Sequence, residues 1–108
     1  DEEPIAAFEA LLAKSREGRY VLRLYIAGNT PRSARAVANL TRVCATYLEG
    51  RYELTVIDLF QTPGQAKDEQ IVVTPTLIKQ LPPPLRRLIG DLSDRDRVLL
   101  ALDITPQE

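Results

Sequence analysis

The sequence contains no histidine and only one cysteine among its 108 residues, and these absences exclude most of the usual catalytic sites. A nucleophilic serine or cysteine needs a base beside it, which histidine most often supplies. A zinc site needs several cysteine or histidine ligands at short spacing. The glycines follow neither the P-loop nor the dinucleotide-binding pattern. We therefore expect a protein that binds rather than catalyses, without cofactor or metal.

The single cysteine and the distribution of apolar residues also indicate the cellular compartment of the protein. Cys44 cannot form an internal disulfide, which suits a reducing cytoplasm, and its place on an apolar helical stripe predicts core packing. No apolar run approaches the roughly 20 residues of a membrane span. The acidic start DEEP is the opposite of a signal peptide. We therefore expect a cytoplasmic protein. The absence of methionine suggests that the natural chain ends have been trimmed.

The net charge of the chain is too small to attract a polyanion to the molecule as a whole. The chain carries 14 basic and 15 acidic side chains, a net charge of -1, with both signs scattered along it. A field that attracts nucleic acid or an anionic membrane is therefore not expected. Electrostatic recognition has to come from local patches, and we expect protein partners.

The length fits one domain, which we place at residues 19–108, preceded by a helical extension at residues 1–18. Pro4 suits a first helical position and Gly18 suits the end of the helix. An isolated helix of this length is marginal unless its apolar stripe docks somewhere. The stripe comprises Ile5, Phe8, Leu11 and Leu12.

The first half of the domain predicts a parallel crossover unit. Residues 20–27 are apolar on both alternating faces, which is typical of a central strand. Thr30 can cap and Pro31 can start a helix that ends near Gly50. Residues 52–60 then form a second strand. A strand, a helix and a strand of this length make a right-handed βαβ unit.

The second half contains more breaks. Pro75 within the β-branched run 71–78 indicates an edge or irregular strand. Ser93, with Asp96 three residues on, indicates the capped start of a last helix, whose apolar face we assign to Val98, Leu99, Leu100 and Leu102. The fold class is therefore α/β, with the order β-α-β-α-β-β-α after the leading helix. The remaining predicted segments are a turn at 61–64, a short polar helix to about Glu69, a proline break at 82–84 and a strand at 85–90.

Several polar positions allow a functional and a structural interpretation. Thr74-Pro75 either forms the cis proline that thioredoxin-like folds place beside their active site, or is a trans edge-strand proline. Arg23, on a central strand, must be paired, reach the sheet surface or lie in an interface. The pair Arg86 and Arg87 either binds a partner or is merely solvated. A cluster of carboxylates at Asp91, Asp94 and Asp96 is better explained by helix capping than by metal binding.

The motifs together resemble one family. The blocks YVLRLYIAGNTPRSARA, VIDLF, VVTPTL, PPPLRRLIGDLSDR and LDI are similar to those of KaiB, a small protein of the bacterial circadian clock. The resemblance covers about residues 20–104, and residues 1–18 have no counterpart in it. It implies a thioredoxin-like scaffold in which the strand-to-helix turn at residues 28–31 lacks the reactive cysteines that thioredoxins carry there.

The resemblance implies a non-enzymatic adaptor. KaiB-like proteins bind the hexameric ATPase and kinase KaiC, sequester the activator KaiA, and compete with output histidine kinases. They also interconvert between a thioredoxin-like monomer that binds KaiC and an oligomeric ground state, a dimer or tetramer with the order β-α-β-β-α-α-β. The residues after about Phe60 differ between the two folds, so both packings must lie within a few kcal/mol of each other.

Site residues follow from the same resemblance. We expect Arg23 and Arg35 to contact the activator or a kinase. We expect the ATPase to be bound by Lys79, Arg86 and Arg87. The positions that we associate with fold switching are Thr74, Pro75, Ala101 and Asp103.

Ala101 departs from the family pattern, which usually has glycine there. Alanine favours a helix over glycine by about 1 kcal/mol. If the segment is helical only in the thioredoxin-like state, the balance shifts roughly fivefold toward that state.

The sequence is also compatible with three other functions. One is a thioredoxin-like oxidoreductase, against which the missing cysteine pair at residues 29–33 argues. Another is the sensor domain of a histidine kinase, because such sensors resemble KaiB. The third is a stress-response or signalling adaptor outside the clock.

Overall fold

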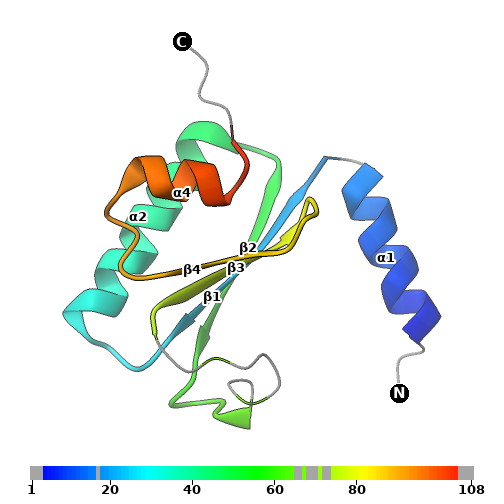
Figure 1. Cartoon of the computed structure of the whole chain (residues 1–108). Helices are drawn as coiled ribbons and strands as arrows, with labels where there is room; N and C mark the ends of the chain where they lie inside the picture. Colours follow the sequence, from blue (N-terminus) through cyan, green and yellow to red (C-terminus); the bar gives the residue numbers. More distant parts are fainter. Residues whose placement is uncertain (1–3, 17, 65–66, 68–70, 72–73, 105–108) are drawn as a thin grey trace.

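The computed structural model describes residues 4–16, 18–64, 67, 71 and 74–104. Its elements appear in Figure 1, coloured from blue at the amino terminus to red at the carboxyl terminus. They are α1 (Pro4–Arg16), β1 (Tyr20–Ile26), α2 (Pro31–Tyr47), β2 (Tyr52–Asp58), β3 (Thr76–Leu81), β4 (Arg86–Ile89) and α4 (Arg95–Ala101).

The four strands form one mixed sheet in the order β2-β1-β3-β4. β1 pairs with β2 in parallel and with β3 antiparallel, and β3 pairs antiparallel with β4. The helices α2 and α4 lie together on one side of this sheet (Figure 1). The structure therefore has the predicted thioredoxin-like arrangement, rather than the alternative order of the oligomeric ground state.

Helix α2 begins where the sequence indicates. Thr30 has an extended backbone, with φ -103° and ψ 157°, and its side chain accepts a hydrogen bond from the Ser33 amide at 3.1 Å. Pro31 occupies the first helical position, where its missing N–H costs nothing. The cap fixes the direction in which α2 leaves the sheet, so its apolar face covers β1.

The core is divided by the sheet into two unequal clusters. The larger cluster lies under α2 and α4 and includes Leu22, Leu24, Leu40, Cys44 and Val98, all fully buried. Burial raises the pKa of the Cys44 thiol to about 11, so the thiolate is suppressed and the residue packs as a small apolar group. The smaller cluster, on the opposite face, comprises Tyr25, Ile57, Ile71 and Ile78.

For residues 71–78 we predicted an edge or irregular strand. The structure corrects the edge position and shows one irregularity in the β1–β3 register, between Val21 and Leu22. β3 begins only at Thr76 and is paired on both sides, so it is a central strand. Pro75 precedes the strand instead of interrupting it, and so removes no hydrogen bond from the ladder. The Thr74–Pro75 peptide bond is cis, as are Leu81–Pro82 and Pro83–Pro84 in the connection to β4. Val72 and Val73 of the predicted strand lie outside the described residues.

The short helix predicted before β3 is described only in part. Gly64 and Lys67 are helical, and the rest of its course to Glu69 lies outside the described residues. The predicted strand at 85–90 is confirmed as β4.

The predicted cap of the last helix is wrong by one residue. Asp94, not Ser93, caps α4, and its Oδ1 accepts a hydrogen bond from the Arg97 amide at 3.2 Å. The Ser93 amide instead donates to Asp91 Oδ1 at 3.1 Å. Leu92, between Asp91 and Ser93, takes a left-handed φ of 63° and inserts into the core. The helix therefore begins later than predicted, at Arg95. Asp91 and Asp94 therefore serve the turn and the cap, as the structural interpretation requires.

The apolar face that we predicted for α4 is also corrected at one position. Val98, Leu99 and Leu102 are buried, whereas Leu100 is 76% exposed. The helix has only seven residues, and Leu100 lies on its outer side.

The leading helix stands apart from α2 and α4, beside the β3–β4 hairpin, and its contacts include β3 (Figure 1). Its described side chains Phe8 and Leu12 are exposed. Among the residues that the structure describes, no helix is long and apolar enough to cross a membrane.

Candidate partner-binding surface

The turn from β1 into α2 contains no cysteine. Gly28 has a left-handed φ of 74°, and its amide donates to Asp58 Oδ1 at 3.0 Å. The same oxygen accepts from the Phe60 amide at 2.9 Å. A Cβ at position 28 would lie 2.7 Å from the Phe60 ring, so the aromatic side chain covers the glycine closely. One carboxylate thus holds the two loops together and presents Phe60, which is 76% exposed.

An open groove runs from this turn along the first half of α2. Its walls combine apolar and small polar side chains, and no thiol lies in it. This composition suits docking of a partner rather than redox exchange. The lining residues are Ile26, Gly28, Asn29, Ser33, Ala34, Val37, Ala38 and Asp58.

Pro75 lies at the same end of the sheet as this turn. It directly precedes Thr76, which pairs with Tyr25 near the carboxyl end of β1. Its carbonyl accepts a hydrogen bond from the Gly90 amide at 3.0 Å. The structure thus brings Thr74 and Pro75 close to the turn, as the thioredoxin-like expectation requires.

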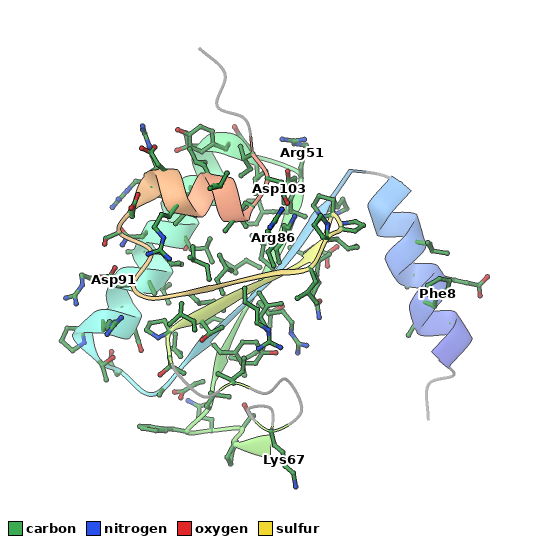
Figure 2. All side chains as sticks on the ribbon, in the orientation of Figure 1. Phe8, Arg51, Lys67, Arg86, Asp91 and Asp103 are labelled. Atoms are coloured by element: carbon green, nitrogen blue, oxygen red, sulfur yellow. The ribbon has the colours of Figure 1, made fainter. Side chains whose placement is uncertain are left out.

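Lys79, Arg86 and Asp103 form one ion-pair cluster at the other end of the sheet. Leu22, Lys79 and Arg86 stand in register on neighbouring strands, on the face that the helices cover. Lys79 Nζ and Arg86 Nε both donate to Asp103 Oδ2, the latter at 3.2 Å. Figure 2 shows Arg86 and Asp103 close together where α4 ends.

This cluster fastens the end of α4 to the sheet. Asp103 follows the helix with a left-handed φ of 57°, which turns its carboxylate back toward β3. Lys79 first and Arg86 second hold the pKa of that carboxyl below its usual value. Lys79 is only 1% exposed, so in this arrangement it acts inside the fold and is not presented to a partner as we had expected.

Arg35 belongs to a second, exposed connection. Its Nε lies 3.1 Å from Asp91 Oδ2, and Asn39 donates to the Asp91 carbonyl at 2.9 Å. Hydrogen bonds from Ser93, followed by the one from Arg35, lower the pKa of Asp91. Arg35 ties α2 to the loop before α4, yet its side chain stays 57% exposed and accessible.

Arg23 lies on the opposite face of the sheet. Its guanidinium carbon stands 5.7 Å from the centre of the Tyr25 ring, a cation–π distance, and the side chain is half-buried. Arg23 pairs with Ile78, which in turn pairs with Arg87, so the two arginines share a row across the sheet. The structure therefore separates the predicted residues into an Arg23–Arg87 face and an Arg35 face.

A further groove, between β4 and α4, contains residues that sequence reasoning missed. Arg97 and the exposed Leu100 join Arg86 and Arg87 there. The signal available in the sequence was the spacing of Arg97 and Leu100, which places both on one side of a helix. The complete lining is Arg86, Arg87, Leu88, Arg97, Leu100 and Ala101.

Replacement of Lys79 tests the ion-pair cluster. Lys79→Ala leaves a cavity under α4 and removes a buried partner of Asp103, so we expect it to lower the free energy of unfolding by about 2 kcal/mol. Urea denaturation measures this loss. Lys67→Ala, at an exposed lysine, is the matched control and should change stability by less than about 0.5 kcal/mol. Equal losses in the two variants would contradict the assignment.

The lowered pKa of Asp103 predicts a pH dependence. A carboxyl whose pKa is lower in the folded than in the unfolded state binds fewer protons when folded. Its contribution to stability is present above about pH 5 and is lost as the pH falls through about 4 and below. We expect Asp103→Asn to flatten the acid limb of a plot of unfolding free energy against pH. Asparagine tolerates the left-handed backbone, so an unchanged slope in this variant would refute the assignment.

Comparisons with known proteins agree with the sequence motifs. The KaiB domain family matches residues 23–104. The circadian clock protein KaiB3 of Synechocystis is 55% identical over 89 residues, covering 82% of this chain and 87% of the relative. The circadian clock oscillator protein KaiB of Acaryochloris marina is 53% identical, with 82% and 86% covered.

Solved structures agree with the fold. The N-terminal domain of SasA from Synechococcus elongatus has a TM-score of 0.65 at 24% identity, covering 83% of this chain and 89% of that domain. Mitochondrial thioredoxin 3 of Saccharomyces cerevisiae has a TM-score of 0.66 at 15% identity, with 92% and 88% covered. These likenesses show a thioredoxin-like fold. Together with the matches in sequence, they establish that this chain belongs to the KaiB family.

Proposed function

We propose that this protein is a non-enzymatic adaptor of a circadian clock that binds a KaiC-type hexameric ATPase. The family and its clock relatives support the clock role. The observation that carries the adaptor role is the β1–α2 turn. There a thioredoxin-like scaffold keeps its cis proline, but residues 29–33 hold no cysteine, and Phe60 from the loop after β2 covers Gly28. The turn thus offers a recognition surface without a thiol.

The register of the sheet does not by itself divide the predicted residues between partners. Arg23 and Arg87 share one face of the sheet, and Arg35 lies on α2. We assign Arg23 and Arg35 to KaiA or to output histidine kinases, and the Arg86–Arg87 edge to the ATPase. The adaptor then sequesters KaiA or competes with a kinase while it is bound to KaiC. We expect the protein to act in the cytoplasm, which agrees with its single, buried and unpaired cysteine.

The second half of the chain is proposed to switch between two folds. Here Ala101 is the last helical residue of α4, and Asp103 fastens that helix to Lys79 and Arg86. In the oligomeric ground state, a dimer or tetramer, this cluster has to break, because the segments that carry it are rearranged. The cluster therefore contributes to the balance between the storage form and the form that binds the ATPase.

A sensor domain of a histidine kinase is the second candidate. The likeness to the N-terminal domain of SasA favours it, since that domain has the same fold. Binding of the isolated chain to a KaiC-type ATPase does not distinguish a clock adaptor from a sensor domain. A kinase segment on the natural polypeptide would identify a sensor domain. A stress-response or signalling adaptor outside the clock would use the same surfaces with a different ATPase.

Arg87 provides the sharpest test of ATPase binding. Arg86 also holds Asp103, so its replacement would disturb α4, whereas Arg87 is exposed on the edge strand. We expect Arg87→Glu to weaken binding to the cognate KaiC-type ATPase by at least about tenfold, or 1.4 kcal/mol. Size-exclusion of mixtures and titration calorimetry measure it. Arg42→Glu, on the exposed side of α2, is the matched control. Unchanged affinity in Arg87→Glu would remove this edge from the interface.

Ala101→Gly tests the fold balance. Glycine costs about 1 kcal/mol in a helix, so we expect the ratio of thioredoxin-like to ground-state molecules to fall by about fivefold. NMR peak populations of the two states measure this ratio. Ala38→Gly, in α2 of the half that both folds share, weakens both states alike and should leave the ratio unchanged. A shift of equal size in both variants would contradict the hypothesis.

A further inference from the structure

The groove that runs from the β1–α2 turn along α2 is largely apolar but carries one charge. It has a volume of about 360 Å³, and Asp58 is the only charged side chain among its described lining residues. Ala34, Val37 and Ala38 line it along the helix. The helix rises by about 6 Å from Ala34 to Ala38. The groove therefore joins an apolar stretch of one helical turn to a carboxylate.

The Asp58 carboxylate has one oxygen to spare. Asp58 pairs with Ile26, which packs against the core under α2, so its side chain lies on the face of the sheet that carries the groove. The amides of Gly28 and Phe60 both donate to Oδ1. No residue in the described part of the chain donates to Oδ2. A donor from outside the molecule can therefore bond to this second oxygen.

Exposed apolar side chains flank the carboxylate. Phe60, whose ring covers Gly28, is 76% exposed. Val56 lies two residues before Asp58 on the same face of β2 and is 42% exposed. A cation beside Asp58 therefore lies close to an aromatic ring, and cation–π attraction adds to the charge attraction. Because the apolar surface extends beyond the groove, it suits a protein segment rather than a free amine.

The basic side chains at the start of α2 are turned toward the other edge of the sheet. Arg35 Nε lies 3.1 Å from Asp91 Oδ2. A Cβ at Gly90 would lie 3.9 Å from an Arg32 guanidinium nitrogen, so Arg32 also reaches this region. Gly90 and Asp91 follow β4, whereas Asp58 ends β2 at the opposite edge. The start of α2 therefore presents positive charge toward β4 and negative charge toward β2.

The lysines of the same molecule lie elsewhere. Lys79 is buried and donates to Asp103. Lys14 belongs to α1, which precedes the opposite end of β1. Figure 2 shows Lys67 pointing away from the sheet. A cation that bonds to Asp58 Oδ2 therefore has to come from outside the molecule.

We propose that this groove binds a lysine side chain of a protein partner. The aliphatic stem lies along Ala34, Val37 and Ala38, and the ammonium donates to Asp58 Oδ2 beside the Phe60 ring. A guanidinium fork uses both oxygens of a carboxylate, whereas an ammonium needs only one, and Oδ1 already accepts from two amides. The inference rests on the proposed adaptor function, to which it adds the chemistry that the β1–α2 turn recognises.

Peptide titration tests the groove without any ATPase. The probe is an acetylated and amidated pentapeptide with lysine at its centre and alanine elsewhere. A second peptide carries ε-N-acetyl-lysine at the centre, which keeps the stem and removes the charge. We expect the wild-type protein to bind the lysine peptide at least about fivefold more tightly. The NMR resonances of the Gly28, Val37 and Phe60 amides report binding.

Asp58→Asn isolates the carboxylate. Asparagine keeps an oxygen that can accept from both loop amides but carries no charge. We expect this variant to bind the lysine peptide only as tightly as the acetyl-lysine peptide, whose affinity stays at the wild-type value. Asp96→Asn is the matched control, because it removes the same charge from a side chain on α4 that is 89% exposed. It should leave both affinities unchanged. The amide spectra confirm that both variants fold.

Three results would overturn the proposal. The first is an absence of shifts at Gly28 and Phe60 up to about 20 millimolar lysine peptide. The second is equal affinity of the wild-type protein for the two peptides, because the groove is then a purely apolar site. The third is a shift of the Gly28 and Phe60 resonances in Lys67→Ala without peptide, because a lysine of this chain, from the same or a second copy, then fills the groove. Each result leaves ATPase binding, which is measured separately, untouched.

Discussion

The buried ammonium of Lys79 is the constraint on which the second half of this structure depends. A charge in a sheet interior has to be paired, and the partner, Asp103, comes from the chain that leaves α4. This requirement fixes where α4 ends, how Asp103 turns, and how Arg86 is held on the edge strand. The ion pairs add to the apolar packing of α4, whose Val98, Leu99 and Leu102 are buried in the main core.

The other end of the sheet shows how a thioredoxin-like scaffold can serve recognition. Asp58 accepts from two loop amides and thereby aligns the Gly28 turn with Phe60. In a redox protein this position has to expose a thiolate. Here the one thiol is in the core, with its pKa raised to about 11 by burial. The geometry of the turn is kept, while its exposed aromatic ring and apolar groove suit a protein partner.

Agreement between sequence and structure depends on how local the deciding interaction is. Thr30 and Pro31 start α2 as predicted, because a cap is decided within four residues. Ser93 does not cap α4, because here the deciding contact is a tertiary one. Leu92 enters the core and bends the chain, which leaves Asp94 as the first residue in position to cap. Pro75 indicated an edge or irregular strand, but it lies one residue before β3, so both edges of that strand stay free to pair.

The sequence by itself determined the family, the α/β class and the βαβ unit, because motifs and hydrophobic period are properties of neighbouring residues. Tertiary structure alone decided that Lys79 is internal, that Arg23 and Arg87 share a face, and that Arg97 and Leu100 complete a groove. Those facts depend on strand register and on the packing of α4. Both are set by contacts between segments that lie far apart in the chain, which no local pattern encodes.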